Sequence, residues 1–323
     1  MAKRDRIVFY GTPEFAVASL KAMYDAGFNI VAVVTAEDKP AGRGRKPKIS
    51  PVKQFAQRKD LPLIQPENLK SEIFLEQLNK LNVDMQVVVA YRMLPRQVWQ
   101  LPPKGTFNLH ASLLPEYRGA APINHAIING EKQTGLTTFF INENIDTGKI
   151  IFQQKTNIYP EDNAGMLHDR MMLQGAELVV KTTEAIEKGE YTTIEQKELY
   201  NGNKEYKMAP KIFRENCRIK WCNKRIDQLR NFIRGLSPYP GAHTFLKAPG
   251  GEIMQLKIFE VAAIEDAHNY PCGQIITDTE KYLDITTNQG YMQILELQLS
   301  GRKKMATAEF LRGFPISSDW KIE

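Results

Sequence analysis

The sequence predicts an α/β fold in which a doubly wound, mostly parallel Rossmann-like sheet is followed by a small C-terminal β-barrel (OB-like) domain. Apolar, strand-like runs alternate with helix-like segments as far as Gly189, which is typical of parallel sheets covered by helices. After Gly189 the alternation stops, and the short alternating segments that follow suit a small antiparallel sheet or barrel. The 323 residues are enough for two domains of ordinary size.

The first half opens with the apolar strand Ile7–Tyr10, which runs into a helix. We expect Thr12 to cap this helix, Pro13 to occupy its first position and Gly27 to end it. Its helical period predicts three buried side chains, Ala16, Leu20 and Met23. The further elements expected in this half are strands at 30–35, 61–65, 84–91, 106–110, 136–141 and 149–154, a helix around 51–59, a second helix before residue 84, and a long closing helix at 163–189.

The second half begins with residues 190–207, a polar stretch with glycine and asparagine that we interpret as a linker. It separates a domain at 1–189 from a second domain at 208–323. A helix within 223–242 is expected to stop at Gly235 and Pro238. The strands expected beyond it are 252–261, 273–278, 281–287 and 291–299.

Composition excludes few function classes. The formal net charge of +6 suits a nucleic-acid or anionic-surface partner, but many small-molecule enzymes share such a charge. The chain has no run of about 20 apolar residues, so neither a membrane span nor a signal peptide is expected, and a cytoplasmic location follows. Its cysteines have no CxxC spacing and no paired histidines, so we expect reduced packing or surface residues and no metal; they are Cys217, Cys222 and Cys272.

The candidate site lies at the end of the strand "TFNLH". Asn108 and His110 are two residues apart, so their side chains point to the same side of the strand. Asp146 follows in a polar, glycine-bearing loop between two strands, and ligands of open parallel sheets bind at the carboxyl ends of strands. The imidazole can act as acid and base, the amide can stabilise an oxyanion, and the carboxylate can hold an imidazolium. On spacing alone, a purely structural histidine–aspartate pair is the alternative.

The segment "SLLPEYRGAAP" after this strand has no helical period and is expected to be an ordered loop. No serine or cysteine is poised as a nucleophile beside the three polar residues, so direct transfer through a tetrahedral intermediate fits better than a covalent enzyme. Two stretches are basic, 39–59 and 207–234. Each is either a solvated face or a surface that follows a phosphate backbone.

The motif "NLHASLLP" with a downstream "DTG" resembles the signature of the folate-dependent formyltransferases. Within that superfamily the chain is most similar to the methionyl-tRNA formyltransferase family, since "FYGTPEFAVASL", "DKPAGRGRK" and "GLTTFFINENIDTG" occur in that family's order. The C-terminal half matches more loosely, through "SPYPGA" among others. The resemblance implies a catalytic centre of Asn108, His110 and Asp146. It further implies a folate site at Ser112, Leu113, Leu114 and Pro115, and tRNA contacts at Lys39, Arg43, Arg45 and Lys46.

The same resemblance implies that 10-formyltetrahydrofolate is the donor and that the methionyl group of initiator tRNA is the acceptor, in translation initiation. Residues 1–189 would then be the catalytic, folate-binding domain and residues 208–323 a tRNA-binding domain. The amine would attack the formyl carbon directly, with no metal. A monomer is expected because no segment has a large exposed apolar face.

Three alternatives remain open. A formyltransferase that acts on an amino-sugar nucleotide, glycinamide ribonucleotide or another small amine would share the same three residues. A hydrolase that deformylates the folate would share them too, and a non-catalytic RNA-binding protein could use the same scaffold. The chain also departs from the family pattern twice, with Arg92 where glycine is usual and with Lys220 where an aspartate commonly precedes the tryptophan. If glycine is needed at 92 for a positive φ or a close approach, Arg92 alters that contact or the loop adjusts.

Overall fold

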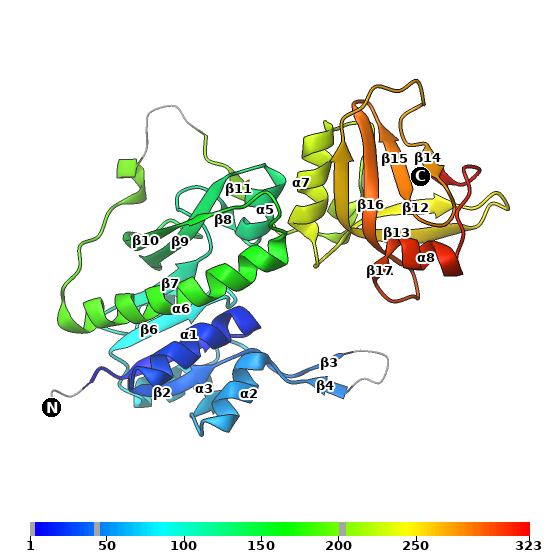
Figure 1. Ribbon diagram of the computed structural model, residues 1–323. Helices are drawn as coiled ribbons and strands as arrows, with labels where there is room; N and C mark the ends of the chain where they lie inside the picture. Colours follow the sequence, from blue (N-terminus) through cyan, green and yellow to red (C-terminus); the bar gives the residue numbers. More distant parts are fainter. Residues whose placement is uncertain (1–3, 42–45, 200–204) are drawn as a thin grey trace. The chain divides into compact units, whose positions relative to one another are not determined.

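The computed structural model describes residues 4–41, 46–199 and 205–323, with side chains outside 39–48 (Figure 1). The chain divides into two compact units. Unit 1 comprises residues 1–119, 134–157 and 168–208, and unit 2 comprises residues 120–133, 158–167 and 209–323. Two short pieces of the first half of the sequence therefore belong to unit 2. No helix in the described part of the chain is long and apolar enough to cross a membrane.

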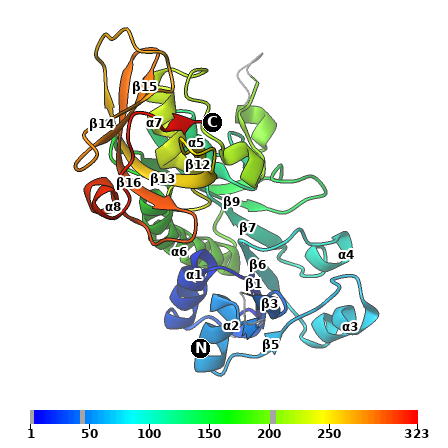
Figure 2. The ribbon, with the colours of Figure 1, turned by 90° about the vertical axis from the view of Figure 1, so that its right-hand side faces the viewer.

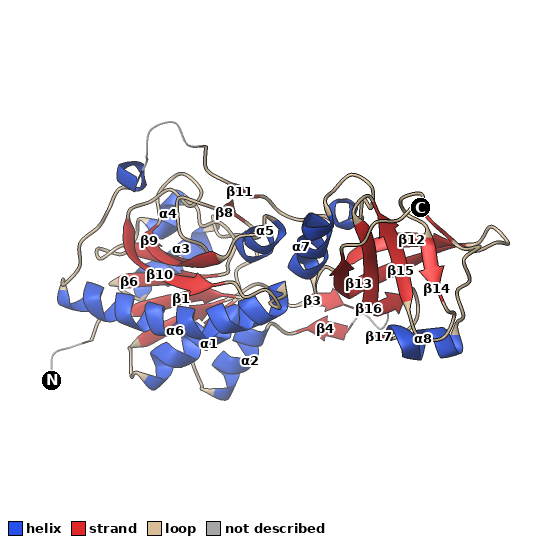
Figure 3. Cartoon of the chain, turned by 45° about the horizontal axis from the view of Figure 1, so that its top comes forward, coloured by secondary structure: helices blue, strands red, loops and turns tan. Residues whose placement is uncertain are grey.

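A seven-stranded sheet forms the centre of unit 1, in the order β10-β9-β7-β6-β1-β2-β5 (Figure 3). Its strands are β1 (Ile7–Gly11), β2 (Ile30–Val34), β5 (Leu63–Ile64), β6 (Met85–Val89), β7 (Thr106–His110), β9 (Gln133–Phe140) and β10 (Ile150–Asn157). The five strands from β7 to β5 pair in parallel, whereas β9 runs antiparallel to β7. The predicted mostly parallel sheet is confirmed.

Helices cover both faces of this sheet. They are α1 (Glu14–Asp25), α2 (Pro51–Arg58), α3 (Glu72–Lys80), α4 (Arg96–Trp99) and α6 (Ala164–Lys188). On one face, Tyr10 of β1 and Val88 of β6 pack with Phe74 of α3 in a continuous apolar cluster. The register pairs Val88 with Asn108, so the predicted site residues of β7 lie on this same face.

The first helix follows the sequence pattern except at its start. The three side chains predicted to be buried are buried: Ala16, Leu20 and Met23. Gly27 follows the helix with a φ of +72°, a left-handed conformation that favours glycine. The predicted cap is wrong, because Pro13 is the N-cap residue and makes no capping hydrogen bond. The Thr12 hydroxyl instead accepts the Ala36 N–H, which links the ends of two adjacent strands.

Several short elements were not expected. Residues of the predicted basic loop form a two-stranded hairpin of β3 (Lys39–Ala41) and β4 (Lys46–Lys48). The two-residue β8 (Arg118–Gly119) lies within the expected ordered loop, and α5 (Pro122–Ile128) follows it. Elements of two to seven residues are too short for hydrophobic periodicity to identify.

Unit 2 is built on an antiparallel sheet in the order β14-β15-β16-β13-β12-β18, with β17 paired to β16. Its strands are β12 (Ala242–Lys247), β13 (Ile253–Ile264), β14 (Ile275–Thr277), β15 (Leu283–Thr287), β16 (Gly290–Leu299), β17 (Met305–Ala306) and β18 (Lys321–Ile322). An isolated bridge joins Gln274, next to β14, with Lys321 of β18. This bridge connects the two edges of the sheet and nearly closes it, so the predicted small barrel is confirmed.

Two helices pack on the barrel, α7 (Ile226–Leu236) and α8 (Thr307–Gly313) (Figure 2). Leu229 and Ile233 of α7 and Phe310 of α8 join the buried cluster of the barrel strands. α7 is the helix predicted to stop near Gly235. β12 and α8 were not predicted. In β12 the polar His243 and Thr244 are buried along with their apolar neighbours, so the strand lacks the alternation that marks a half-buried strand.

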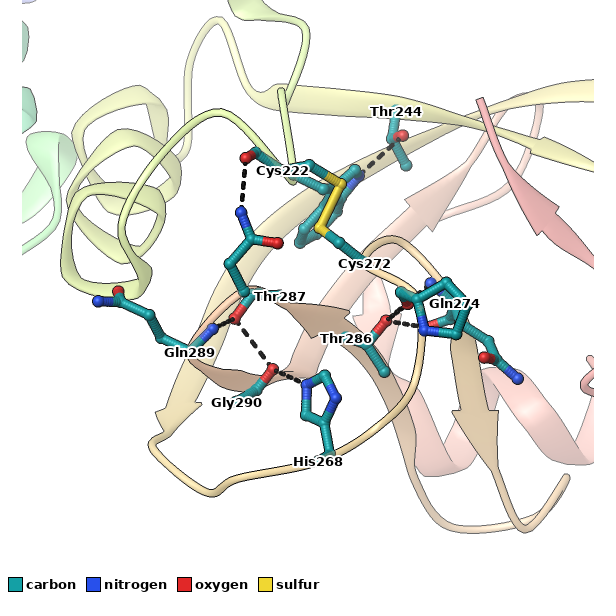
Figure 4. The surroundings of a disulfide bond; sticks show 12 residues. Cys222, Thr244, His268, Cys272, Gln274, Thr286, Thr287, Gln289 and Gly290 are labelled. Carbon is teal, nitrogen blue, oxygen red and sulfur yellow. Dashed lines mark hydrogen bonds between the residues drawn. A yellow bond between two sulfur atoms is a disulfide. The ribbon is translucent and has the colours of Figure 1, made fainter.

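The prediction that all cysteines are reduced is wrong for two of the three. Cys222 and Cys272 form a disulfide whose Cα atoms are 5.8 Å apart (Figure 4). They are separated by 50 residues, and their pairing depends on how the barrel folds, which spacing alone does not encode. Cys217 is a buried free thiol, as a packing residue should be, and burial raises its pKa.

Candidate active site

Strand β7 delivers an amide and an imidazole to its carboxyl end. Asn108 and His110 pair across the sheet with Phe139 and Thr137 of β9 and lie on one side of the strand. His110 is buried, with 7% of its surface exposed, whereas Asn108 is half-buried. The Asn108 side chain has no hydrogen-bond partner among the residues that the structure describes. Its amide is therefore available to a ligand.

Asp146 approaches the imidazole from the loop between β9 and β10. Its Oδ2 lies 3.8 Å from Nδ1 of His110 and accepts the backbone N–H of Gly119 at 3.0 Å. The aspartate has a φ of +54°, an uncommon backbone conformation for a residue with a side chain. The structure therefore brings together the three polar residues that the sequence suggested, at one edge of the sheet of unit 1.

The backbone of the following loop determines which imidazole nitrogen carries a proton. Nε2 of His110 lies 2.9 Å from the carbonyl oxygen of Tyr117. A carbonyl can only accept, so Nε2 donates its hydrogen there. Nδ1 is then the nitrogen that faces the Asp146 carboxylate and can take up or release a proton.

The loop predicted to line the folate site is anchored by side chains of β9 and β10. Thr137 donates its hydroxyl to the Ser112 carbonyl and accepts the Leu114 N–H, and Gln153 donates to the Leu114 carbonyl. The Ser112 and Leu114 side chains are buried, and Leu113 is half-buried. The bond between Leu114 and Pro115 is cis. A ligand on this loop would therefore meet the Leu113 side chain and backbone groups.

Two polar side chains at this edge were missed by sequence reasoning, Arg118 and Gln196. Gln196 lies on the short 3-10 turn η1 (Gln196–Leu199), within the segment interpreted as a linker. Its amide donates to the carbonyls of Asp146 and Gly148, and its oxygen accepts from the Arg118 guanidinium. Arg118 is adjacent to the recognised motif and could have been suspected. Gln196 stands in a polar stretch without any pattern.

The structure accommodates the first departure from the family pattern, which is Arg92 in place of the usual glycine. Arg92 donates to the carbonyls of Pro66 and Glu67, and its guanidinium lies 5.8 Å from the Tyr91 ring centroid. Among the described residues of this loop the positive φ occurs at Ala90, with +48°, and not at Arg92. A need for positive φ therefore does not restrict position 92, and the arginine connects two loops at this edge.

The second departure, Lys220 in place of the common aspartate, lies on the surface. Lys220 is exposed, whereas Trp221 beside it is buried and donates its indole N–H to the Thr244 hydroxyl. Around it the second basic stretch is largely exposed. Its exposed cations include Lys211, Arg214, Arg218, Lys220 and Arg225.

The residues predicted to contact tRNA are only partly described. Lys39 and Lys46 lie in β3 and β4, of which the backbone is described, and Arg43 and Arg45 lie outside the described residues. Farther along the same stretch, Lys53 pairs with Asp38, and Arg58 is exposed.

Comparison with known proteins assigns a family to this fold and site. Residues 5–183 match the formyl transferase family, and residues 211–315 match the C-terminal domain of formyl transferases. The chain therefore belongs to the formyl transferase family.

The relatives narrow the comparison further. The chain is 49% identical to a methionyl-tRNA formyltransferase of Bacteroides thetaiotaomicron over the full length of both. It is 52% identical to a methionyl-tRNA formyltransferase of Azobacteroides pseudotrichonymphae over 97% of each chain. Among solved structures, the sugar 3N-formyl transferase WlaRD aligns with a TM-score of 0.62 and 20% identity, covering 94% of this chain and 100% of that one. This last likeness concerns the fold.

Proposed function

We propose that the protein transfers the formyl group of 10-formyltetrahydrofolate to the α-amino group of methionine on initiator tRNA, in translation initiation. The observation that carries the proposal is the convergence of Asn108, His110 and Asp146 at one edge of the sheet. It occurs in a formyl transferase about half identical, over its whole length, to proteins named methionyl-tRNA formyltransferase.

The reaction needs a group that stabilises charge on the formyl oxygen. The amine nitrogen attacks the formyl carbon, the carbonyl oxygen becomes an oxyanion, and the bond from carbon to the folate nitrogen then breaks. The Asn108 amide, which has no partner among the described residues, is suited to donate to this oxyanion. One such donor typically lowers the activation free energy of acyl transfer by about 2.7–4 kcal/mol.

The reaction also needs to move one proton from the attacking amine to the departing folate nitrogen. Nδ1 of His110 is the nitrogen suited to this step, because Nε2 is bound to the Tyr117 carbonyl. Asp146, whose Oδ2 lies 3.8 Å from Nδ1, would orient the ring and accept or relay the amine proton through water. We therefore assign the main acid–base role to His110, and to Asp146 the orientation of the ring and a supporting role in removing the amine proton.

The folate would bind beside this centre on the loop Ser112–Pro115. The buried Ser112 and Leu114 side chains hold the loop, so its contacts with the folate would be made by Leu113 and by backbone groups. The hydrogen bonds from Thr137 and Gln153 keep these backbone groups in place before the folate arrives.

The tRNA would be held by cations of both basic stretches, including Lys39, Arg43, Arg45 and Lys46. Replacing Arg43 and Arg45 with alanine should weaken tRNA use and spare folate affinity. Each cation removed from a phosphate should reduce the salt dependence of tRNA binding by about 0.7–0.9 in the slope of log K against log salt. The matched control is Lys80→Ala, an exposed cation at the end of α3.

The decisive experiment offers the purified protein 10-formyltetrahydrofolate with one acceptor at a time. The acceptors are charged initiator tRNA, glycinamide ribonucleotide, an amino-sugar nucleotide, and water. Formyl-methionyl-tRNA should form fastest by orders of magnitude. A preference for a small amine or for water would replace this proposal with the corresponding transferase or hydrolase, and tRNA binding without turnover would indicate a non-catalytic protein. We also propose that the protein is cytoplasmic and monomeric. Gel filtration of the enzyme at working concentration checks the monomeric state.

A further inference from the structure

A single glutamine side chain connects the two loops that surround His110. Gln196 is 3% exposed, although it lies in a polar stretch whose neighbours Lys197 and Glu198 are exposed. Burying a primary amide is costly unless its donors and acceptor are all used. The cost of burying the Gln196 amide must therefore be offset by specific hydrogen bonds.

Both N–H donors of this amide point to the loop between β9 and β10 that carries Asp146, here called the aspartate loop. Nε2 of Gln196 donates to the carbonyl of Asp146 and to the carbonyl of Gly148, each at 2.9 Å. The two carbonyls stand on either side of Thr147, so one NH₂ group bridges the turn that carries the catalytic carboxylate. Such a bridge restrains the backbone rather than the carboxylate itself.

The acceptor of the amide points to the other loop. Oε1 of Gln196 accepts from Nε of Arg118 at 3.1 Å and from Nη2 at 2.5 Å. Arg118 is followed by Gly119, whose N–H donates to the Asp146 carboxylate. It is preceded by Tyr117, whose carbonyl accepts from His110. Gln196 therefore connects the backbone of Asp146 to the short segment that contacts both Asp146 and His110.

The aspartate loop has features that make such a restraint necessary. Asp146 has a φ of +54°, a conformation that costs a residue with a side chain about 1–3 kcal/mol and persists only where the surroundings enforce it. Gly148 has no room for a side chain, because a Cβ there would lie 1.6 Å from the Phe140 carbonyl oxygen. Without the bonds from Gln196, we expect Asp146 to relax toward an ordinary conformation and its carboxylate to move away from Nδ1.

We propose that Gln196 is a positioning residue for the formyl-transfer reaction, acting through the backbone of Asp146 and through Arg118. This inference rests on the catalytic role proposed above for Asp146. Displacing a catalytic group by about 1 Å can cost about 100-fold in rate. Removing the hydrogen bonds of Gln196 should therefore lower kcat by about 10- to 100-fold and leave the KM for the folate within about twofold.

The first variant is Gln196→Met, which keeps the length and volume of the side chain and removes all four hydrogen bonds. The second is Gln196→Glu, which keeps the acceptor for Arg118 and replaces the two N–H donors with an oxygen facing two carbonyls. Both should lose turnover, and the full-length protein should keep its far-UV circular dichroism and its folate affinity. The matched control is Glu198→Gln on the same turn, whose kcat should not change. Wild-type turnover in both Gln196 variants would overturn the inference.

A double-mutant cycle with Asp146→Asn separates positioning from general structural damage. If Gln196 acts through Asp146, then Gln196→Met should lower kcat by less than about threefold in the Asp146→Asn background, because coupled residues are not additive. An equal loss in both backgrounds would overturn the positioning role. Unimpaired turnover of Asp146→Asn alone would contradict the proposed function. Impaired Asp146→Asn together with fully active Gln196→Met would contradict only the present inference.

Discussion

The candidate active site of unit 1 and the barrel of unit 2 are stabilised by different interactions. Around His110 the contacts are directional hydrogen bonds between loops, made by Gly119, Gln196 and Arg118. In unit 2 the barrel strands and two helices enclose one large apolar cluster, and a disulfide joins two distant loops. The difference indicates that single polar changes in unit 1 should alter chemistry more than stability. Changes in unit 2 should do the opposite.

The largest expected effect follows from removing the carboxylate of the site. Asp146→Asn keeps the shape of the side chain and its bond to Gly119 but removes the negative charge that faces Nδ1 of His110. General acid–base assistance is typically worth about 10²- to 10⁴-fold, so kcat should fall within that range. Folate affinity, measured by equilibrium binding, should change by no more than a few fold.

The control for this variant is Asp319→Asn, an exposed aspartate of unit 2. Equal losses of turnover and of folate affinity in Asp146→Asn would mean that Asp146 binds the folate rather than serving the transfer step. That outcome would also weaken the contrast between the two units.

The second effect is one of stability. The Cys222–Cys272 disulfide closes a loop of 50 residues, for which the chain-entropy relation gives a stabilisation of about 4 kcal/mol. Cys222→Ser together with Cys272→Ser should therefore lower the free energy of unfolding of unit 2 by about this amount. Denaturant unfolding followed by the fluorescence of the buried Trp221 measures it.

A reducing agent should reproduce this destabilisation in the wild type and have no effect on the double variant. Folate affinity should remain unchanged in both, because the folate site is proposed to lie in unit 1. Since cytoplasmic thiols are mostly kept reduced, the reduced form bears directly on the proposed location. Identical unfolding of the double variant and the oxidised wild type would contradict a stabilising role for the bond.

A smaller effect, on both stability and turnover, is expected from a change at Gly148. Gly148→Ala places a methyl group against the Phe140 carbonyl, so the backbone next to Asp146 must shift. Overpacking of this kind typically costs about 1–3 kcal/mol of stability, and turnover should fall with it. The control is Gly250→Ala, where a Cβ would meet nothing within 4 Å. Full activity in Gly148→Ala would show that the aspartate loop tolerates displacement.

The smallest expected effect is the pH dependence of the stability of unit 2. His243 is buried, and burial, followed by the nearby Arg214, Lys257 and Arg218, lowers its pKa in the folded state. As the pH falls through about 6.5, the imidazole of His243 becomes protonated in the unfolded chain but stays neutral in the folded chain. The free energy of unfolding should therefore decrease toward acid pH, by at most about 1.4 kcal/mol per pH unit for one proton, until the folded state is protonated too.

This pH effect can be isolated with His243→Gln, which removes the titrating group and keeps a polar side chain. Unfolding of unit 2 at pH 7.5 and 5.5 should differ less in this variant than in the wild type. An equal pH dependence in both proteins would assign the effect to other groups.

The sequence predicted the sheet of unit 1 well because its central strands are continuously buried. Strands such as Met85–Val89 are buried on both faces and, apart from Gln86, apolar, and this pattern identifies them without further information. The candidate site could be predicted because Asn108 and His110 share one strand end and because the surrounding motif is distinctive. The geometric relation of Asp146 to the imidazole could only be suggested, since it depends on a loop conformation.

The parts that were missed are those in which tertiary contacts override local pattern. β12 buries His243 and Thr244, so its burial does not follow its polarity. The disulfide depends on the proximity of loops that are 50 residues apart. Gln196 stands in a segment of linker-like composition, and only its hydrogen bonds to Asp146 and Gly148 reveal its place in the site.

The position of Gln196 along the chain has a practical consequence for the choice of truncated fragments. A fragment ending at residue 189 would contain every residue proposed for chemistry and still lack this amide, as well as the bridge between Ile194 and Ile150. Extending the fragment through Leu199 would restore both. An inactive short fragment would therefore give no information on whether formyl transfer requires the barrel.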